Sequence, residues 1–389
     1  MNAEAAARRD TPPPSAKTST VMVALGARAY PIHVGRGLLA RAGELCAPIL
    51  KQRRVFIVTD ATVAPLYLDA LTAGLKAAEI HTDQFIVPAG EASKSFAQLE
   101  KILAAMLAAK CERSTMIVAL GGGVVGDLAG FAAAVLLRGV DFIQVPTTLL
   151  AQVDSSVGGK TGINTSAGKN LVGAFHQPRL VLADTDILAT LPRREVLAGY
   201  AEVAKYGLLG DAGFWAWLET NGAAALSGGE DAHALLRHCI VTSCEAKARI
   251  VAADERESGE RALLNFGHTF GHALEAEIGY GGDLLHGEAV AMGMVMAFKL
   301  SARLGLCPDA DVGRVVAHFE AVGLKTAPPK QGPRGAITPA MLIGHMRQDK
   351  KTKDGALTFV LARGIGNAVL TDAVPTDKLE DTLHAALNG

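Results

Sequence analysis

Long apolar runs are missing from this sequence. None approaches the roughly 18 to 20 residues of a membrane span, because Gly, Asp or Lys interrupts each candidate. An excess of either charge is also missing: the net charge is -1, and Lys and Arg are spread among Asp and Glu. No basic surface for nucleic acid is therefore indicated. We expect a soluble protein without nucleic-acid or membrane partners, and small anionic ligands remain compatible with this composition.

Cysteine is scarce as well. The five cysteines lie in separate segments and form no CxxC motif: Cys46, Cys111, Cys239, Cys244 and Cys307. This pattern argues against a disulfide framework and favours a reducing compartment. We expect buried thiols in a cytoplasmic protein.

The chain is long enough for two domains, with 389 residues of which 49% are hydrophobic. Its first stretch, Met1–Thr20, contains Arg8-Arg9 and Pro12–Pro14 and lacks the apolar core of a signal peptide. We expect a disordered tail there. A transit peptide is the alternative, but Glu4 and Asp10 suit such acid-poor sequences badly.

The next part of the chain, residues 21–190, alternates short β-branched runs with helical stretches such as Phe96–Ala109, a pattern typical of βαβ units. The expected strands are Val55–Asp60, Phe85–Val87, Met116–Leu120, Phe142–Val145 and Leu180–Ala183. We therefore predict a Rossmann-like α/β domain with a mostly parallel sheet that binds a nucleotide.

Beyond Leu191-Pro192 the hydrophobic period becomes 3.6, which predicts an all-α second domain over residues 191–389. The expected helices are Arg194–Leu209, Ala212–Glu219, Ala232–Ala252, Leu263–Ile278, Gly287–Leu304, Val312–Val322 and Asp377–Leu387. Two short late strands, Leu357–Leu361 and Ala368–Leu370, are also expected within it.

A possible metal site lies in the second domain. His268 and His272 are four residues apart and share one helix face, and His286 heads the next apolar helix. Core histidines with satisfied nitrogens are the alternative. Gly267 and Gly271 weaken that alternative, because glycine costs roughly 1 kcal/mol per helix position relative to Ala. Something must approach this helix closely, and metal or substrate is the first interpretation.

A second candidate site is the glycine-rich turn Gly121–Asp127, which follows a strand and opens a helix. Such a turn lets backbone N–H groups approach a pyrophosphate, although tight packing alone also explains glycines there. Asp60 ends another strand and could accept a hydrogen bond from a ribose hydroxyl. A turn or N-cap role for Asp60 is the alternative.

The sequence also contains a loop with glycines and lysines, and two couples of opposite charges. Val153–Asn164 lacks Walker A spacing, but its glycines and Lys160, with Lys169-Asn170, could form a concave cationic surface for a phosphate; a solvated surface loop is the alternative. Glu202 and Lys205 share a helix face, and so would Glu257 and Arg261 in a helix. Taken alone, we interpret each of these two couples as an ordinary ion pair.

Six motifs, taken together and in order, resemble the 3-dehydroquinate synthases, a family within the wider sugar-phosphate cyclases and more distantly similar to glycerol-type dehydrogenases. They are Gly121–Asp127, Gln144–Asp154 running into Gly158–Lys160, Gly168–Gly173, Gly199–Lys205, Leu264–Glu275 and His286–Glu288. Together with single matching residues, the resemblance extends from about Asp60 to Lys351 and so covers both predicted domains.

The resemblance implies a divalent metal, zinc or cobalt, held by Glu202, His268 and His286, so that His272 belongs to the substrate site instead. The implied phosphate contacts are His272, Lys160, Asn170 and the Lys350-Lys351 pair, with Arg138 reaching in from the partner of a homodimer. The implied carboxylate contacts are Lys247 and Arg261. Hydroxyl contacts fall on Asp154, Lys205, Glu257 and Asn265.

The resemblance also implies NAD+ as cofactor and 3-deoxy-D-arabino-heptulosonate 7-phosphate as substrate. Implied NAD contacts are Asp60, Glu91, Lys94, Gly123, Val124, Val125, Gly126, Asp127, Thr147, Thr148, Lys160, Lys169 and Thr190. The implied reaction is transient oxidation, phosphate elimination, re-reduction and an intramolecular aldol closure to 3-dehydroquinate. A metal- and NAD-dependent polyol dehydrogenase, or another sugar-phosphate cyclase, is the alternative; Lys247 favours the first reading, since relatives whose substrates lack the carboxylate need no such cation.

Overall fold

The first half of the chain is built around a seven-stranded sheet. The computed structural model describes residues 18–257, 259–279, 283–349 and 357–388. The strands, in spatial order, are β1 (Ser19–Val23), β2 (Tyr30–Gly35), β9 (Leu180–Asp184), β6 (Phe142–Pro146), β5 (Met116–Gly121), β3 (Arg54–Asp60) and β4 (His81–Val87). Only the β1–β2 pair is antiparallel. The predicted α/β sheet is thus confirmed.

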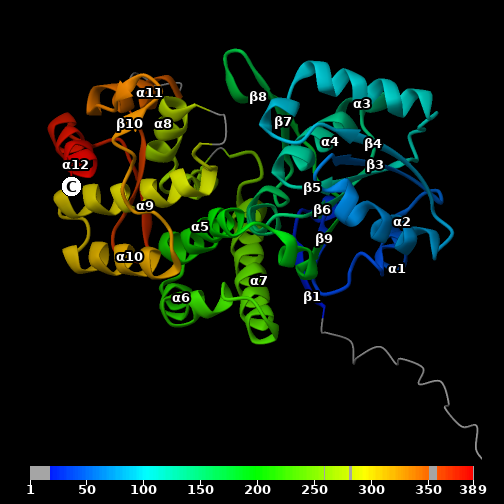
Figure 1. Ribbon diagram of the computed structural model, residues 1–389, viewed down its shortest axis with the longest axis horizontal. Helices are drawn as coiled ribbons and strands as arrows, with labels where there is room; N and C mark the ends of the chain where they lie inside the picture. Colours follow the sequence, from blue (N-terminus) through cyan, green and yellow to red (C-terminus); the bar gives the residue numbers. More distant parts are fainter. Residues whose placement is uncertain (1–17, 258, 280–282, 350–356, 389) are drawn as a thin grey trace, which may run out of the picture.

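Helices cover both faces of this sheet (Figure 1). Alternate residues of β3 point to opposite faces: Phe56 and Val58 pack with α3 (Phe96–Ala108) and α4 (Gly123–Val135), whereas Val55 and Ile57 pack with α1 (Ala42–Cys46) and α2 (Asp69–Lys76). Both faces of β5, β6 and β9 are buried. This explains why these strands are continuous apolar runs rather than alternating ones.

The described part of the second half is helical, with two small hairpins. Its helices are α5 (Arg193–Gly210), α6 (Ala212–Ala225), α7 (Glu230–Ala253), α8 (His268–Ile278), α9 (His286–Arg303), α10 (Asp309–Val322), α11 (Pro339–Asp349) and α12 (Thr376–Asn388). The hairpins are β10 (Gln331–Gly332) with β11 (Gly335–Ala336), and β12 (Phe359–Ala362) with β13 (Ala368–Thr371). No helix of the described residues is both long and apolar enough to cross a membrane.

The two halves share a hydrophobic core. One cluster of buried side chains includes Val21 and Val34 of the sheet together with Tyr200 of α5, Cys244 of α7 and Met294 of α9. All five cysteines are buried and unpaired, as expected. The packing of α7 against the β1–β2 edge, in particular, fixes the helical half relative to the sheet.

The histidine-bearing helix is shorter than predicted. Instead of one helix from Leu263 to Ile278, a 3-10 turn covers Glu260–Asn265 and α8 begins only at His268. Gly267 separates them in a left-handed conformation, with φ of 80°. Glycine adopts this conformation without the steric cost that a Cβ brings.

The glycines of α8 serve helix packing, so the interpretation that metal or substrate approaches them is wrong. A Cβ at Gly271 would lie 3.1 Å from the carbonyl oxygen of Ala289 in α9. A Cβ at Gly293 of α9 would lie 2.1 Å from the carbonyl oxygen of Gly267. The close approach is that of α9 itself.

Two other expectations require correction. Ser19 and Thr20 belong to β1, so they are not part of a disordered tail; residues 1–17 lie outside the described residues. The supposed phosphate loop is a π-helical turn, Ala151–Ser155, followed by the hairpin of β7 (Lys160–Thr165) and β8 (Gly168–Phe175). Lys160 pairs with Phe175 at one end of this hairpin. Lys169 lies on β8 six residues before Phe175, near the other end of the hairpin, and the cationic phosphate surface stays a prediction.

Candidate active site

Three side chains that could hold a metal meet where α5, α8 and α9 converge. Glu202 lies within α5, and His268 and His286 are the first residues of α8 and α9. Glu202 Oε1 is 3.6 Å from the Nε2 atoms of both His268 and His286. Glu202 is fully buried, and Oε1 accepts no hydrogen bond from any described residue. A buried carboxylate oxygen with no donor is costly unless a cation completes it.

The imidazoles are held in an orientation that suits metal binding. Nδ1 of His268 lies 3.1 Å from the carbonyl oxygen of Phe266, and Nδ1 of His286 lies 3.2 Å from Glu275 Oε2. These acceptors favour a proton on each Nδ1, which leaves Nε2 as the ligand atom. The donor set of one carboxylate and two imidazoles fits zinc or cobalt with open positions for substrate oxygens.

The two histidines differ in how readily they are protonated. Burial, with Lys205 next in importance, lowers the pKa of His268 well below its usual value. Burial also opposes charge on His286, but the carboxylates of Glu202 and Glu275 outweigh it and raise its pKa to about 10. Metal binding must therefore displace a proton from His286.

A second group of possible ligands, His272, Glu275 and His286, shares one histidine with the first. Here, however, both carboxylate oxygens are engaged: Glu275 Oε1 accepts from Lys169 Nζ at 3.1 Å, and Oε2 accepts from His286. His272 lies beside the first group, with its ring centroid 5.3 Å from that of His268. The Oε1 atom of Glu202, which accepts no hydrogen bond from a described residue, makes the first group the better metal candidate; it is the group that the family resemblance implies.

A buried network of charges extends from Glu202. Lys205 Nζ pairs with Glu202 and lies 3.7 Å from Asp154 Oδ1. Asp154 also accepts from Lys247 Nζ at 2.8 Å and from the hydroxyl of Tyr206 at 2.9 Å. Burial would raise the pKa of Asp154, but Lys247 and Lys205 outweigh it and lower that pKa well below its usual value. Glu202 and Lys205 are thus a buried pair and not an ordinary surface pair.

Arg261 is buried. The expected ion pair between Arg261 and Glu257 is not formed. The guanidinium of Arg261 donates to the carbonyl oxygens of Gly158, at 3.0 Å, and Glu255, while Nε is buried without an acceptor among the described residues. Glu257 instead accepts from Asn265 Nδ2 at 3.0 Å and pairs with Lys160. Guanidinium N–H groups form strong hydrogen bonds to carboxylates, and Arg261 keeps one N–H without an acceptor in the described part of the chain.

The predicted nucleotide contacts gather at the carboxyl ends of the parallel strands, where α/β sheets bind nucleotides. Gly123–Asp127 form the first turn of α4; Asp60 ends β3, and Thr147 and Thr148 follow β6. Asp60 Oδ1 accepts from the backbone N–H groups of Thr62 and Val63, so it does cap a turn. Thr190 contacts the hydroxyl of Tyr67.

Glu91 and Lys94 line a hollow of about 560 Å³ together with Asn164 of the hairpin. Lys94 Nζ pairs with Asp127 Oδ2 at 2.7 Å and also contacts Asn170. Lys94, Asp127 and Asn170, which come from three segments, are thereby brought together.

Other predicted residues lie apart or cannot be placed. Arg138 follows α4 on the exposed surface, with φ of 69°, and Lys350 and Lys351 lie outside the described residues. The sequence interpretation did not assign Tyr206 or Glu275 a role. Glu275 could have been noticed, because it lies three residues after His272 and so faces the same side of the helix.

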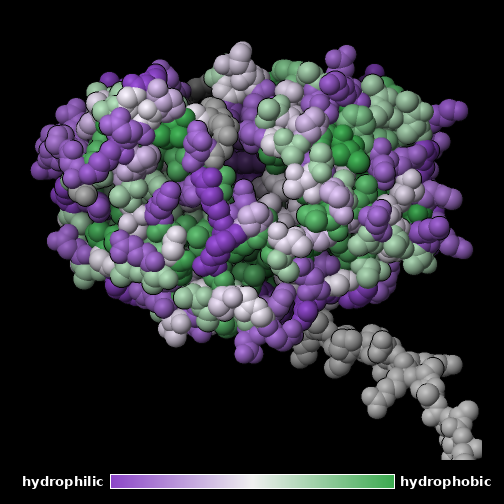
Figure 2. Space-filling model, viewed as in Figure 1, coloured by the Kyte–Doolittle hydropathy of each residue, from purple (hydrophilic) through white to green (hydrophobic). Residues whose placement is uncertain are grey.

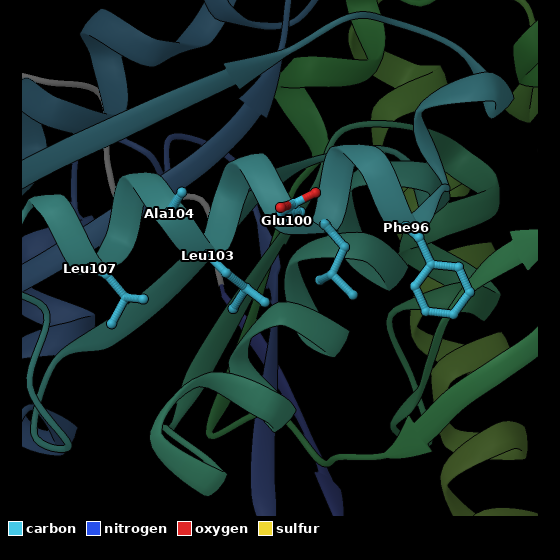
Figure 3. Close-up of a pocket in the computed structure, with 6 residues that line it drawn as sticks. Phe96, Glu100, Leu103, Ala104 and Leu107 are labelled. Carbon is cyan, nitrogen blue, oxygen red and sulfur yellow. The ribbon is translucent and has the colours of Figure 1, made fainter.

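The surface hollows differ in the residues that line them. The face shown in Figure 2 is hollowed between the two halves of the molecule. A second hollow of about 370 Å³ runs along α3 (Figure 3), lined by Phe96, Leu99, Glu100, Leu103, Ala104 and Leu107. Glu100 is the only charged residue in that lining, and none of the predicted site residues belongs to it.

Comparison with known families decides the classification. Sequence models described as 3-dehydroquinate synthase N-terminal and C-terminal match residues 84–198 and 199–352. The chain belongs to the 3-dehydroquinate synthase family. A 3-dehydroquinate synthase of Rhodospirillum rubrum is 62% identical, with 96% of each chain covered. One from a Jannaschia species is 55% identical, covering 96% of this chain and all of its own.

Solved structures agree with this family. A 2-epi-5-epi-valiolone synthase of Streptomyces hygroscopicus with NAD+ and Zn²⁺ bound is 30% identical, has a TM-score of 0.82, and covers 92% of this chain and 96% of its own. A 2-deoxy-scyllo-inosose synthase complexed with carbaglucose-6-phosphate, NAD+ and Co²⁺ is 27% identical, with a TM-score of 0.83, and covers 95% and 100%. Glycerol dehydrogenase of Schizosaccharomyces pombe, at 16% identity and a TM-score of 0.62 over 92% and 88%, shares the fold alone.

Proposed function

We propose that this chain is a 3-dehydroquinate synthase. It converts 3-deoxy-D-arabino-heptulosonate 7-phosphate to 3-dehydroquinate and phosphate, as part of aromatic amino acid biosynthesis by the shikimate pathway. The observation that carries the proposal is the buried Oε1 of Glu202, which accepts no hydrogen bond from a described residue and faces two oriented histidines, beside Lys247 and Arg261. A divalent metal and an anionic substrate would complete this arrangement.

Two bound groups would supply chemistry that side chains lack. NAD+ would accept a hydride and return it, and Zn²⁺ or Co²⁺ on Glu202, His268 and His286 would lower the pKa of the substrate hydroxyl. The strand ends and the α4 N-terminus, with Asp60, Glu91, Lys94, Lys169 and Thr190 among the contacts, are the proposed cofactor site. Each half of the chain, 21–190 and 191–389, provides one of the two sites.

The chain's own part is to position the substrate and to match its charge. Lys247 and Arg261 would bind the carboxylate. His272, Lys160, Asn170 and Lys350 would bind the phosphate, and Asp154, Lys205, Glu257 and Asn265 would bind hydroxyls. No dedicated strong base is assigned, since the departing phosphate can take the proton. We further propose a cytoplasmic homodimer in which Arg138, exposed on the surface, reaches the partner's phosphate site.

Lys247 offers a test of the carboxylate assignment. Two of its three N–H donors are used by Asp154, through the carbonyl oxygen at 2.7 Å and Oδ1 at 2.8 Å, and the third remains for substrate. Lys247→Met should lower kcat/KM roughly 10- to 100-fold, because a hydrogen bond to a charged group contributes about 1.5–3 kcal/mol. Steady-state kinetics would measure this, with the exposed Lys101→Met of α3 as the control. An unchanged kcat/KM in Lys247→Met would contradict the assignment.

The reaction itself separates this proposal from a polyol dehydrogenase. The purified chain is incubated with the heptulosonate phosphate, NAD+ and Zn²⁺ or Co²⁺, and inorganic phosphate, NADH and the carbocyclic product are measured. We expect phosphate release with no accumulation of NADH, since the hydride is returned in each cycle. Accumulating NADH without phosphate release would instead indicate a dehydrogenase.

A further inference from the structure

Glu275 links the predicted metal site to the nucleotide-binding half. It lies on α8 and is 5% exposed. Its Oε2 is 3.2 Å from Nδ1 of His286, the first residue of α9, and its Oε1 is 3.1 Å from Nζ of Lys169, on β8. The β7–β8 hairpin lies between the two halves of the molecule (Figure 1). One carboxylate thus joins α8 to α9 and to β8, and Lys169 of β8 lies 106 residues earlier in the chain.

The burial of Glu275 indicates a specific task. A buried carboxylate is unfavourable unless its partners are well placed, and both oxygens of Glu275 have partners. Because Glu275 holds Nδ1 of His286, the opposite ring nitrogen, Nε2, is directed toward Glu202 at 3.6 Å.

We propose that Glu275 is a positioning residue that orients the metal ligand His286 and, through Lys169, connects the β7–β8 hairpin to the metal site. The proposal rests on the metal site of the proposed function. Glu275 binds neither substrate nor metal in this arrangement. Its two oxygens orient the side chains of His286 and Lys169.

The hairpin is connected to the nucleotide side as well. Asn170, next to Lys169, contacts Lys94, which pairs with Asp127 of α4. The backbone N–H of Asn170 donates to Asn164 Oδ1 at 2.9 Å, and Asn164 Nδ2 donates to Glu91 Oε1 at 2.7 Å. A ligand that fixes Glu91 and Lys94 would also fix Lys169. NAD+ binding and metal binding should therefore influence each other, and this influence must be reciprocal.

The test uses metal affinity, and α8 provides a matched control. Glu277 lies two residues after Glu275 on the same helix, is 3% exposed, and pairs with Arg334 and His345. The dissociation constant for Zn²⁺ is measured by competition with a chelator, on the metal-free full chain without substrate. Glu275→Gln should weaken Zn²⁺ binding roughly 10- to 100-fold, as loss of an outer partner of a metal ligand does. Glu277→Gln should leave Zn²⁺ binding unchanged even if it lowers the unfolding temperature.

Thermal unfolding of the metal-free variants shows whether each variant is folded. If Glu275→Gln does not fold, Glu275→Asp replaces it, because it keeps the charge but withdraws the oxygens by about one C–C bond, roughly 1.5 Å. Unchanged Zn²⁺ affinity in a folded Glu275 variant would overturn the inference while leaving the proposed function intact. If the wild-type chain and Glu277→Gln bound no Zn²⁺, the metal site itself would be refuted.

The connection through Lys169 has its own readout. The Zn²⁺ dissociation constant of the wild-type chain is measured with and without saturating NAD+, and the ratio of the two values should differ from one. Lys169→Met should bring that ratio close to one. A wild-type ratio of one, or a ratio unaffected by Lys169→Met, would overturn this part of the inference.

Discussion

His268→Ala is expected to abolish metal binding and turnover together. The substitution removes one of the two imidazole nitrogens that lie 3.6 Å from the unsatisfied oxygen of Glu202. Loss of an outer partner already weakens a metal site by roughly 10- to 100-fold, so loss of a ligand should exceed that. We expect no stoichiometric metal after dialysis and a fall in kcat of more than about 100-fold.

Bound metal is measured by elemental analysis of the purified variant, and kcat by phosphate release. His384→Ala, an exposed residue of α12, is the control and should retain both. The metal-free wild-type chain is the reference for folding, because it lacks metal but keeps the imidazole. Stoichiometric metal in His268→Ala would mean that the ligand assignment is wrong.

The sheet was predictable because its strands are buried on both faces. Strands such as β5 and β6 must then be apolar throughout, and a short run of β-branched residues stands out from the amphipathic helices around it. Most helix ends of the second half were predicted within three residues, but α6 continues six residues beyond the predicted end at Glu219, and α11 was not predicted. The break at Gly267 was missed, since the sequence Leu263–Ile278 keeps a helical period on both sides of it. In the structure, Gly267 is left-handed and lies so close to α9 that a Cβ there would be 2.6 Å from the Met294 side chain.

The β7–β8 hairpin was not predicted because long-range contacts stabilise it. Its glycines and lysine resembled a phosphate loop, and its strands lack a clear alternation. In the structure, a Cβ at Gly173 would lie 2.0 Å from the carbonyl oxygen of Thr161, so glycine is needed for the two strands to approach. A Cβ at Gly130 of α4 would lie 2.5 Å from the Thr161 methyl group, which shows how closely the hairpin packs on that helix. Neither contact can be inferred from local sequence.

Only part of the candidate site could be predicted from residue spacing alone. Spacing identified His268 and His272 as a pair but could not say which of them faces Glu202, which is 66 residues earlier in the chain. Family resemblance suggested the division, and the structure brings Glu202, His268 and His286 together. The burial of Arg261 could not be foreseen, since its position after Glu257 suggested an exposed helical pair. Its guanidinium donates to the carbonyl oxygen of Gly158, which is 103 residues away in the chain, and to that of Glu255.

His272→Ala is expected to retain metal while losing most activity. The structure makes this a discriminating test, because His272 belongs to the second possible ligand group, with Glu275 and His286. Both oxygens of Glu275 already have partners, so that group offers a cation less unsatisfied charge than Glu202 does. If His272 binds the substrate phosphate, its loss removes an electrostatic contact to the leaving group. Such a loss typically costs roughly 10²- to 10³-fold in kcat.

Metal content and kcat of His272→Ala are measured beside those of His268→Ala, so that the two histidines are compared on one helix. We expect stoichiometric metal in His272→Ala and none in His268→Ala, with low turnover in both. The reverse pattern would place the cation between His272, Glu275 and His286, and Glu275 would then be a ligand instead of a positioning residue. Metal loss in both variants would mean that the cation lies between the two groups, with His286, their common member, at the centre of the site.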